Sequence, residues 1–130
     1  MPHITLDYSA NMEARTDIAA LCCHLRQAAA ATGVFPLAGI RVRAFAANHT
    51  SIADGDDRHG YLDISIRLRA GRDLDTRKRA AQAVFEAAQS FLEPAMRQHS
   101  IALSLEMRNI DPELSPKCGT IRDHMQKADQ

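Results

Sequence analysis

The chain has 130 residues, of which 45% are hydrophobic and 25% charged, and its sixteen basic residues are balanced by sixteen acidic ones. These proportions are those of an ordinary globular protein and exclude a disordered or fibrous chain, while the zero net charge disfavours binding to nucleic acid or to an anionic membrane. The apolar runs are too short to cross a bilayer and the N-terminus lacks a signal-peptide pattern, so we expect one cytoplasmic domain over residues 1–130.

The first half of the chain predicts a strand, a helix and a second strand. Apolar and polar residues alternate over residues 3–8, as in a strand with two unlike faces. From about Asn11, apolar residues recur at helical intervals up to Gly33, which predicts one long amphipathic helix. After a short turn, alternation resumes at Ile40 and predicts a second strand. The polar segment 47–60 is expected to be an exposed loop.

The second half of the chain repeats this order of elements. Strict alternation over residues 61–68 predicts a third strand, and Asp73 is the predicted N-cap of the helix that follows. Pro94 is expected to break or kink that helix, because it lacks the backbone N–H and crowds the preceding turn. Alternating apolar residues from Ile101 to Met107 predict the fourth strand, and the tail after Asn109 shows no clear periodicity.

These two strand–helix–strand units predict an α/β fold, in which a four-stranded sheet carries two helices on one face. Residues 4–8 and 42–46 read as aliphatic on both faces of their strands, or nearly so. Because two helices shield only one side of a sheet, we expect self-association to cover the other side. The tail from about residue 110 is expected to take part in the subunit contacts.

The sequence offers no convincing metal or cofactor site. Cys22, Cys23 and His24 are potential metal ligands that are adjacent in sequence. They are not expected to bind one ion, because adjacent residues diverge around a helix and no second ligand pair has suitable spacing. Cys22 is therefore interpreted as a core residue, and a disulfide framework is not expected from three cysteines. His49 and His59 lie in the polar segment and are expected to be exposed. No phosphate-binding loop or supported Ser/His/Asp pattern is evident, so no metal and no cofactor are implied.

Pro2 is the first candidate catalytic residue. Methionine aminopeptidases generally remove Met1 before a small second residue, and this removal would leave the secondary amine of Pro2 as the N-terminus. That amine can act as a base only when it is neutral, and desolvation or nearby guanidinium groups would lower its pKa toward the working pH. A Met-Pro start is weak evidence by itself, because many unrelated proteins begin this way. Here the proline leads directly into a strand, which would hold its amine in place.

Three arginines are candidates for binding an anionic substrate. Arg41 and Arg43 share one face of the second predicted strand, and Arg72 lies between a glycine and the predicted N-cap. In isolation, each is more simply explained as an ordinary surface arginine. Arginine forks nevertheless bind carboxylates in a bidentate manner, and strand ends and βα connections are where α/β proteins gather ligands. With Pro2, these arginines outline a site for an anionic substrate.

Several short segments carry a resemblance to a known family. They are Met1–His3, Tyr8–Asn11, Ala53–Gly55, Ala70–Arg72 and, as the specific part, the block Ala31–Arg43. Together they resemble the 5-carboxymethyl-2-hydroxymuconate isomerases of the tautomerase superfamily. The resemblance extends from Met1 to about Asn109, is loose between Ala44 and Arg58, and is poor in the tail.

The resemblance implies a homotrimer of double βαβ subunits and a cofactor-independent keto–enol isomerase of aromatic catabolism, specifically of homoprotocatechuate degradation. It implies that Pro2 acts as base and then as acid, while Arg41 and Arg72 hold the substrate carboxylates and stabilise the dienolate charge. Arg43 is a further possible contact. The expected reaction converts 5-carboxymethyl-2-hydroxymuconate, or a similar dicarboxylate or tricarboxylate dienol, to its conjugated 2-oxo isomer.

Two alternatives to this reaction stay open. A tautomerase-type site can also serve the hydration or dehalogenation of a related unsaturated acid, but those reactions need an additional water-activating carboxylate, for which no clear motif is seen. The other alternative is a trimeric binding module without catalysis.

Overall fold

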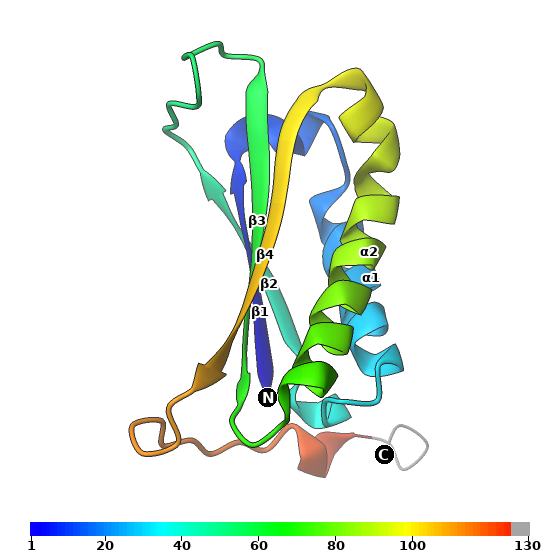
Figure 1. Cartoon of the computed structure of the whole chain (residues 1–130), viewed down its shortest axis with the longest axis vertical. Helices are drawn as coiled ribbons and strands as arrows, with labels where there is room; N and C mark the ends of the chain where they lie inside the picture. Colours follow the sequence, from blue (N-terminus) through cyan, green and yellow to red (C-terminus); the bar gives the residue numbers. More distant parts are fainter. Residues whose placement is uncertain (126–130) are drawn as a thin grey trace.

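The structure is a computed structural model that describes residues 1–125, and it contains two βαβ units that share one sheet (Figure 1). The first unit consists of β1 (Pro2–Ser9), α1 (Ile18–Ala31) and β2 (Arg41–Ala47). The second consists of β3 (His59–Arg69), α2 (Leu74–Gln98) and β4 (Ser100–Ile110). Short 3-10 helices are η1 (Ala10–Ala14), η2 (Leu37–Gly39) and η3 (Arg122–His124). The predicted order of strands and helices is confirmed.

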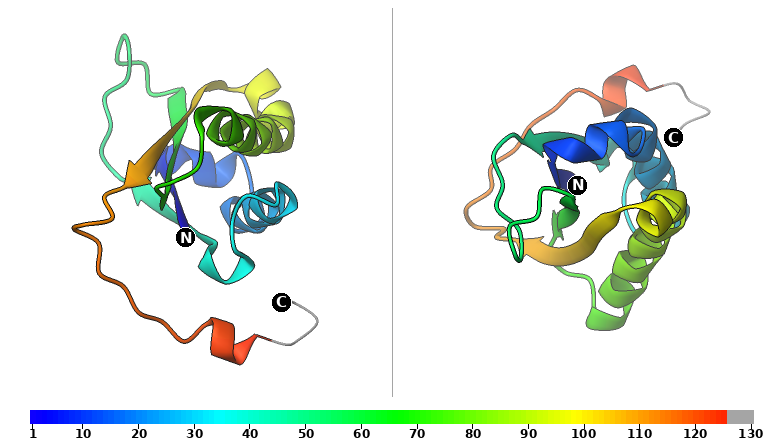
Figure 2. Two further views of the ribbon diagram at one scale, coloured as in Figure 1. Left: turned by 60° about the horizontal axis from the view of Figure 1, so that its bottom comes forward. Right: turned by 90° about the horizontal axis from the view of Figure 1, so that it is seen from above.

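The strands lie in the order β2-β1-β3-β4. β1 is parallel to β2 and β3 is parallel to β4, whereas the two units meet through the antiparallel pair β1 and β3. Both helices lie side by side on one face of this mixed sheet (Figure 2). The predicted fold class, an α/β fold of two βαβ units with both helices on one face, is therefore confirmed.

The core lies between the sheet and the two helices. Alternate residues of β1 and β3 are fully buried, as their period of two predicts, and they face a stripe of apolar residues on each helix. These residues are Ile4, Leu6, Leu62, Ile64, Ile66 and Leu68 on the strands and Leu21, Leu25, Val84, Ala88 and Leu92 on the helices. Burying one such leucine or isoleucine stabilises the fold by about 1.5–3 kcal/mol, so this layer fixes the register of the central strands.

The helix-free face of the sheet is more polar than the sequence analysis expected. Ile4 and Leu6 pair with Val42 and Ala44 on the helix side, whereas Thr5 pairs with Arg43 on the opposite side. The strands therefore have one apolar and one largely polar face, and the prediction that both faces are nearly aliphatic is wrong. The composition of this face therefore does not by itself require self-association.

Helix α1 begins later than the predicted start near Asn11. The carboxylate of Asp17 accepts a hydrogen bond from the backbone N–H of Ala20 at 2.9 Å and so caps a helix that starts at Ile18. The preceding residues form η1, in which Met12 is fully buried. The capping residue, rather than the spacing of apolar residues, thus sets the start of α1, while its end lies close to Gly33, as predicted.

Helix α2 contains Pro94 and continues to Gln98, so the predicted break does not occur. Proline removes one backbone hydrogen bond of the helix, but Leu92 and Ala95 on either side of it are buried against the rest of the protein, and this packing offsets the loss. The predicted N-cap is confirmed, because the Asp73 side chain accepts from the backbone N–H of Thr76 at 2.8 Å.

The remaining sequence predictions concern single residues. Cys22 packs partly against the core, and its burial raises the pKa of its thiol, as expected for a core cysteine. His49 is exposed as expected, but His59 is half-buried, with Nε2 2.7 Å from Asp54 Oδ1 and Nδ1 2.7 Å from Ser100 Oγ. His59 thus tethers the polar loop to β4. Within the described residues, no helix has the length and apolarity that a membrane span needs.

Candidate active site

The topology brings four distant segments to one end of the sheet. Because β1 and β2 are parallel, Arg41 begins β2 beside the start of β1. β3 runs antiparallel to β1, so the C-terminal end of β3 reaches the same end of the sheet, where Leu68 pairs with Pro2. β4 is parallel to β3, so the tail after Ile110 starts there too. The polar loop 48–58 lies at the opposite end (Figure 1).

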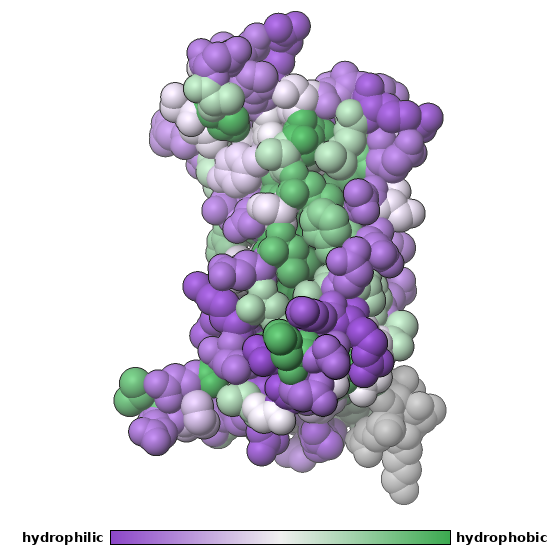
Figure 3. Space-filling view, viewed as in Figure 1, coloured by the Kyte–Doolittle hydropathy of each residue, from purple (hydrophilic) through white to green (hydrophobic). Residues whose placement is uncertain are grey.

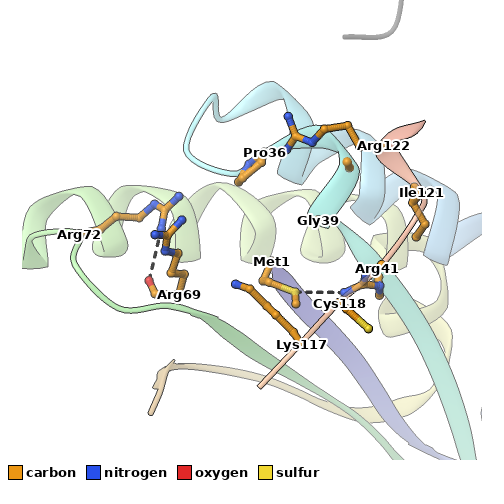
Figure 4. Close-up of a pocket in the computed structure, with 12 residues that line it drawn as sticks. Met1, Pro36, Gly39, Arg41, Arg69, Arg72, Lys117, Cys118, Ile121 and Arg122 are labelled. Atoms are coloured by element: carbon orange, nitrogen blue, oxygen red, sulfur yellow. Dashed lines mark hydrogen bonds between the residues drawn. The ribbon is translucent and has the colours of Figure 1, made fainter. Parts of the chain in front are cut away.

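A cavity of about 370 Å³ opens around Met1 at this end (Figure 4). Its lining residues are Met1, Pro36, Ala38, Gly39, Arg41, Arg69, Arg72, Lys117, Cys118, Gly119, Ile121 and Arg122. Among these described residues, five side chains are basic and none is acidic. A concave wall with charges of one sign concentrates a positive field, so the cavity suits a small anion with several carboxylates.

Met1 occupies the space directly in front of the first strand. Its backbone nitrogen lies so close to Gly39 that a Cβ at position 39 would overlap it, so a side chain at the end of η2 would intrude into this space. Arg41 Nη1 donates a weak hydrogen bond to Met1 Sδ at 3.1 Å. Pro2, the next residue, is buried at the start of β1. Removing Met1 would therefore expose the Pro2 nitrogen to this cavity.

The pKa of the N-terminal amine is lowered from its ordinary value, first because burial disfavours the ammonium form and then because nearby side chains are positively charged. These charges, in decreasing order of effect, belong to Lys117, Arg41, Arg72 and Arg69. The amine in the structure is that of Met1, which stands in for the amine of Pro2, one residue further into β1. This environment favours a neutral amine, as a general base requires.

Arg72 is held in place by backbone carbonyls. Its Nε and Nη2 donate to Val34 O at 3.1 and 2.8 Å, and its Nη1 donates to Arg69 O at 3.3 Å. Gly71, at φ 118°, gives the turn that leads from β3 to this arginine. These three hydrogen bonds leave one N–H group on Nη1 and one on Nη2. These two N–H groups can together bind one carboxylate. Arg72 is therefore a preorganised cation rather than a mobile surface side chain.

Arg43 lies away from the group formed by the chain start, Arg41 and Arg72. It follows Arg41 by two residues on the same face of β2, is exposed, and places Nη1 3.5 Å from His3 Nδ1. It does not line the cavity around Met1. The structure thus brings three of the four predicted site residues to one end of the sheet, with Pro2 just behind Met1, and leaves Arg43 outside.

Arg69 and Lys117 line the cavity but were not predicted as site residues from the sequence. Arg69 ends β3 and could have been found, because it directly precedes the block Ala70–Arg72 that carries part of the family resemblance. Lys117 lies in the aperiodic tail, and no sequence signal placed it near the chain start. Both side chains also line a second cavity of about 500 Å³ on the other side of Met1.

The sequence matches the profile of the 5-carboxymethyl-2-hydroxymuconate isomerase family over residues 2–125. It is 32% identical over 117 residues to the 5-carboxymethyl-2-hydroxymuconate Delta-isomerase of Escherichia coli, and the match covers 90% of this chain and 93% of that enzyme. A crystal structure of 5-carboxymethyl-2-hydroxymuconate delta-isomerase has a TM-score of 0.89 at 28% identity, over 98% of this chain and 94% of that chain.

A fused 4-OT described as a symmetric trimer has a TM-score of 0.65 at 15% identity, over 87% of this chain and 91% of that chain. At this identity the likeness concerns the fold alone, and it agrees with the tautomerase-like arrangement of two βαβ units. The full-length match to the family and the identity to the Escherichia coli enzyme carry more weight. The chain therefore belongs to the 5-carboxymethyl-2-hydroxymuconate isomerase family, and it is an isomerase.

Proposed function

We propose that this isomerase converts 5-carboxymethyl-2-hydroxymuconate, or a closely similar 2-hydroxymuconate dienol, to its conjugated 2-oxo isomer, with the amine of Pro2 as proton shuttle and without a cofactor. The observation that carries this proposal is the cavity around the chain start, where the lowered pKa of the N-terminal amine coincides with a lining of basic side chains. A neutral amine supplies a base, and the surrounding cations attract and hold a carboxylate-rich substrate.

The proton moves from oxygen to carbon in two steps. The neutral Pro2 amine takes the proton of the 2-hydroxyl group, and the O–H electron pair spreads over the dienolate from the C2 oxygen to C5. The resulting ammonium then returns the proton to C5, so that C2 becomes a ketone conjugated with the C3–C4 double bond. The numbers of atoms and electrons are unchanged, and the amine ends the cycle neutral.

Arg41 and Arg72 have two roles in this proposal. Each binds a substrate carboxylate or the developing oxyanion, and charge-assisted hydrogen bonds of this kind are stronger than neutral ones. Each also disfavours a second positive charge nearby and so keeps the amine neutral between turnovers. Arg43 can contribute only indirectly in this arrangement, through its contact with His3.

The mechanism requires removal of Met1, because the nitrogen of Pro2 has no basic lone pair while it is part of a peptide bond. Intact mass of protein from a cell with normal processing should show a chain without Met1. The activity is followed as an ultraviolet change with a panel of 2-hydroxymuconates, and the control is a chain that keeps one extra residue before Pro2.

The extended control should fold and lose activity. An active protein that retains Met1 quantitatively would refute the proline mechanism. Hydration or dehalogenation of a related unsaturated acid in place of dienol isomerisation would favour a different tautomerase-type reaction, and ligand binding without turnover would favour a binding module.

We also propose that the chain works as a homotrimer. A fused 4-OT with the same fold is described as a symmetric trimer. Within residues 1–125, each edge strand, β2 and β4, has one side without a paired strand, and Phe45 on β2 is 58% exposed. Beside α2, Phe85 and Leu105 line a groove, and Figure 3 shows hydrophobic residues gathered in a band between α2 and β4. Head-to-tail pairing of two unlike edges can close into a ring.

The remaining expectations are part of the same proposal. We infer that residues 1–130 form one domain, of which residues 126–130 lie outside the described part of the chain, and that the segment from about residue 110 also takes part in subunit contacts. The family membership supports a role in aromatic catabolism, specifically homoprotocatechuate degradation, and the composition supports a cytoplasmic location.

A further inference from the structure

Two cavities flank the start of the chain. The first contains Arg41 and Arg72, and the second, of about 500 Å³, contains His3 and Arg67. The residues common to both linings are Met1, Arg69 and Lys117. The wall between the cavities therefore consists of the residue that is removed in the proposed enzyme and of two cations. Removal of Met1 would take away one of these three residues, at the place where the Pro2 amine would then begin the chain.

The second cavity is also cationic. Arg67, Arg69 and Lys117 line it, and none of its described lining residues is acidic. Within residues 1–125, the Lys117 ammonium has no hydrogen-bond or ion-pair partner, and the side chain is exposed on the segment that follows β4. Figure 4 shows this side chain reaching from the tail toward Met1. Lys117 is therefore available to a ligand at the junction of the two cavities.

The proposed substrate has a branch at the carbon that receives the proton. C5 of 5-carboxymethyl-2-hydroxymuconate carries both a carboxylate and a carboxymethyl arm, and C5 has to lie at the Pro2 amine during protonation. Both substituents then lie beside the chain start, where the cavities meet. If the diene and its terminal carboxylates occupy the first cavity, the arm points toward the second.

We propose that the second cavity binds the carboxymethyl arm and that Lys117, at the junction, makes the enzyme selective for a branched tricarboxylate over an unbranched dicarboxylate. This inference rests on the proposed function and assigns the C-terminal segment a part in substrate recognition. Arg67 lines only the second cavity, where it would also contact the arm, whereas Arg41 and Arg72 line only the first. Lys117 also contributes the largest charge effect on the N-terminal amine, in agreement with its place at the junction.

The test compares kcat/KM for 5-carboxymethyl-2-hydroxymuconate with kcat/KM for 2-hydroxymuconate, which lacks the arm. Lys117→Met should lower the ratio of the two values roughly ten-fold, as expected for the loss of one charge-assisted contact. Arg67→Met should lower the ratio in the same direction, and Lys117→Arg should keep most of it. Arg26→Met, which removes an exposed cation of α1 outside both cavities, should leave it unchanged.

A general loss of structure or of proton transfer would lower both values equally, so equal losses, or an unchanged ratio in Lys117→Met, would overturn the proposal. Binding of unreactive anions gives a second measurement that does not depend on turnover. Calorimetry should show that the wild-type protein without Met1 prefers tricarballylate to glutarate and that Lys117→Met loses this preference. An inactive wild-type protein would refute the proposed function, whereas a preference that survives in Lys117→Met would refute this inference.

Discussion

Alanine substitutions at Arg41 and Arg72 should have different effects, although both residues line the same cavity. The described hydrogen bond of the Arg41 side chain goes to Met1 Sδ and disappears when Met1 is removed. Arg72, in contrast, donates three hydrogen bonds to the carbonyls of Val34 and Arg69. Arg72→Ala should therefore lower both activity and stability, whereas Arg41→Ala should lower mainly activity.

The size of each effect follows from the contacts. A hydrogen bond to a charged group contributes about 1.5–3 kcal/mol, so the loss of a substrate carboxylate contact at either arginine should lower kcat/KM about 10- to 150-fold. In Arg72→Ala the half-buried Val34 carbonyl also loses its donors, which costs about 1 kcal/mol or more. For a chain of this size, that cost should lower Tm by roughly 3–6 °C.

The pH dependence should change in the same variants. The charge of each arginine lowers the pKa of the N-terminal amine, so its removal should raise the pKa of the Pro2 amine. A smaller fraction of the amine is then neutral at a given pH, and the acidic limb of the pH–rate profile should move to higher pH. Lysine at either position returns the positive charge but not the planar guanidinium group that binds a carboxylate in a bidentate manner. It should therefore restore the position of the acidic limb better than it restores KM.

The assays are ultraviolet kinetics across pH for the alanine and lysine variants, and thermal unfolding at one protein concentration. An acidic limb that stays in place in both alanine variants would show that these arginines do not flank the proline. Equal losses of thermal stability in both would refute the distinction drawn from the Arg72 contacts.

Two further predictions concern the proline and the assembly. Pro2→Ala should keep the fold but lower kcat by about 10²–10⁴-fold, because a primary amine of altered basicity and position replaces the ring nitrogen; unchanged turnover in a folded variant would remove Pro2 from the mechanism. Sedimentation at micromolar concentration should give the mass of a trimer, and a stable monomer would contradict the proposed assembly.

The sheet was predictable because its signal is local. Alternation fixes which residues of β1 and β3 are buried, and these strands begin and end within two residues of the predicted bounds. The start of α1 depended on a single capping carboxylate, Asp17, and the persistence of α2 through Pro94 depended on packing against the sheet. Neither property can be obtained from the spacing of apolar residues alone.

The candidate site was predictable only in part, because its geometry depends on strand pairing. Arg41 and Arg43 share a face of β2, but two residues along a strand correspond to roughly 6–7 Å, which is enough to leave Arg43 outside the cavity. Arg72 was predicted as a site residue because it lies between Gly71 and the N-cap residue Asp73. Lys117 joins the site through the path of the tail after β4, which has no periodic pattern.

The antiparallel contact between β1 and β3 makes the two halves of the chain pseudo-symmetric, so each end of the sheet presents an equivalent arrangement. At the far end, β3 begins at His59 beside the start of β4, and Arg15 takes the place that Arg72 has at the near end. Its Nη1 donates to Ser100 O, after α2, at 3.2 Å, much as Arg72 donates to Val34 O, after α1. Yet His59 continues an existing peptide chain and can never offer a free amine. A sheet built from two such units can therefore offer an N-terminal amine at one end only, and the proposed proline chemistry is confined to that end.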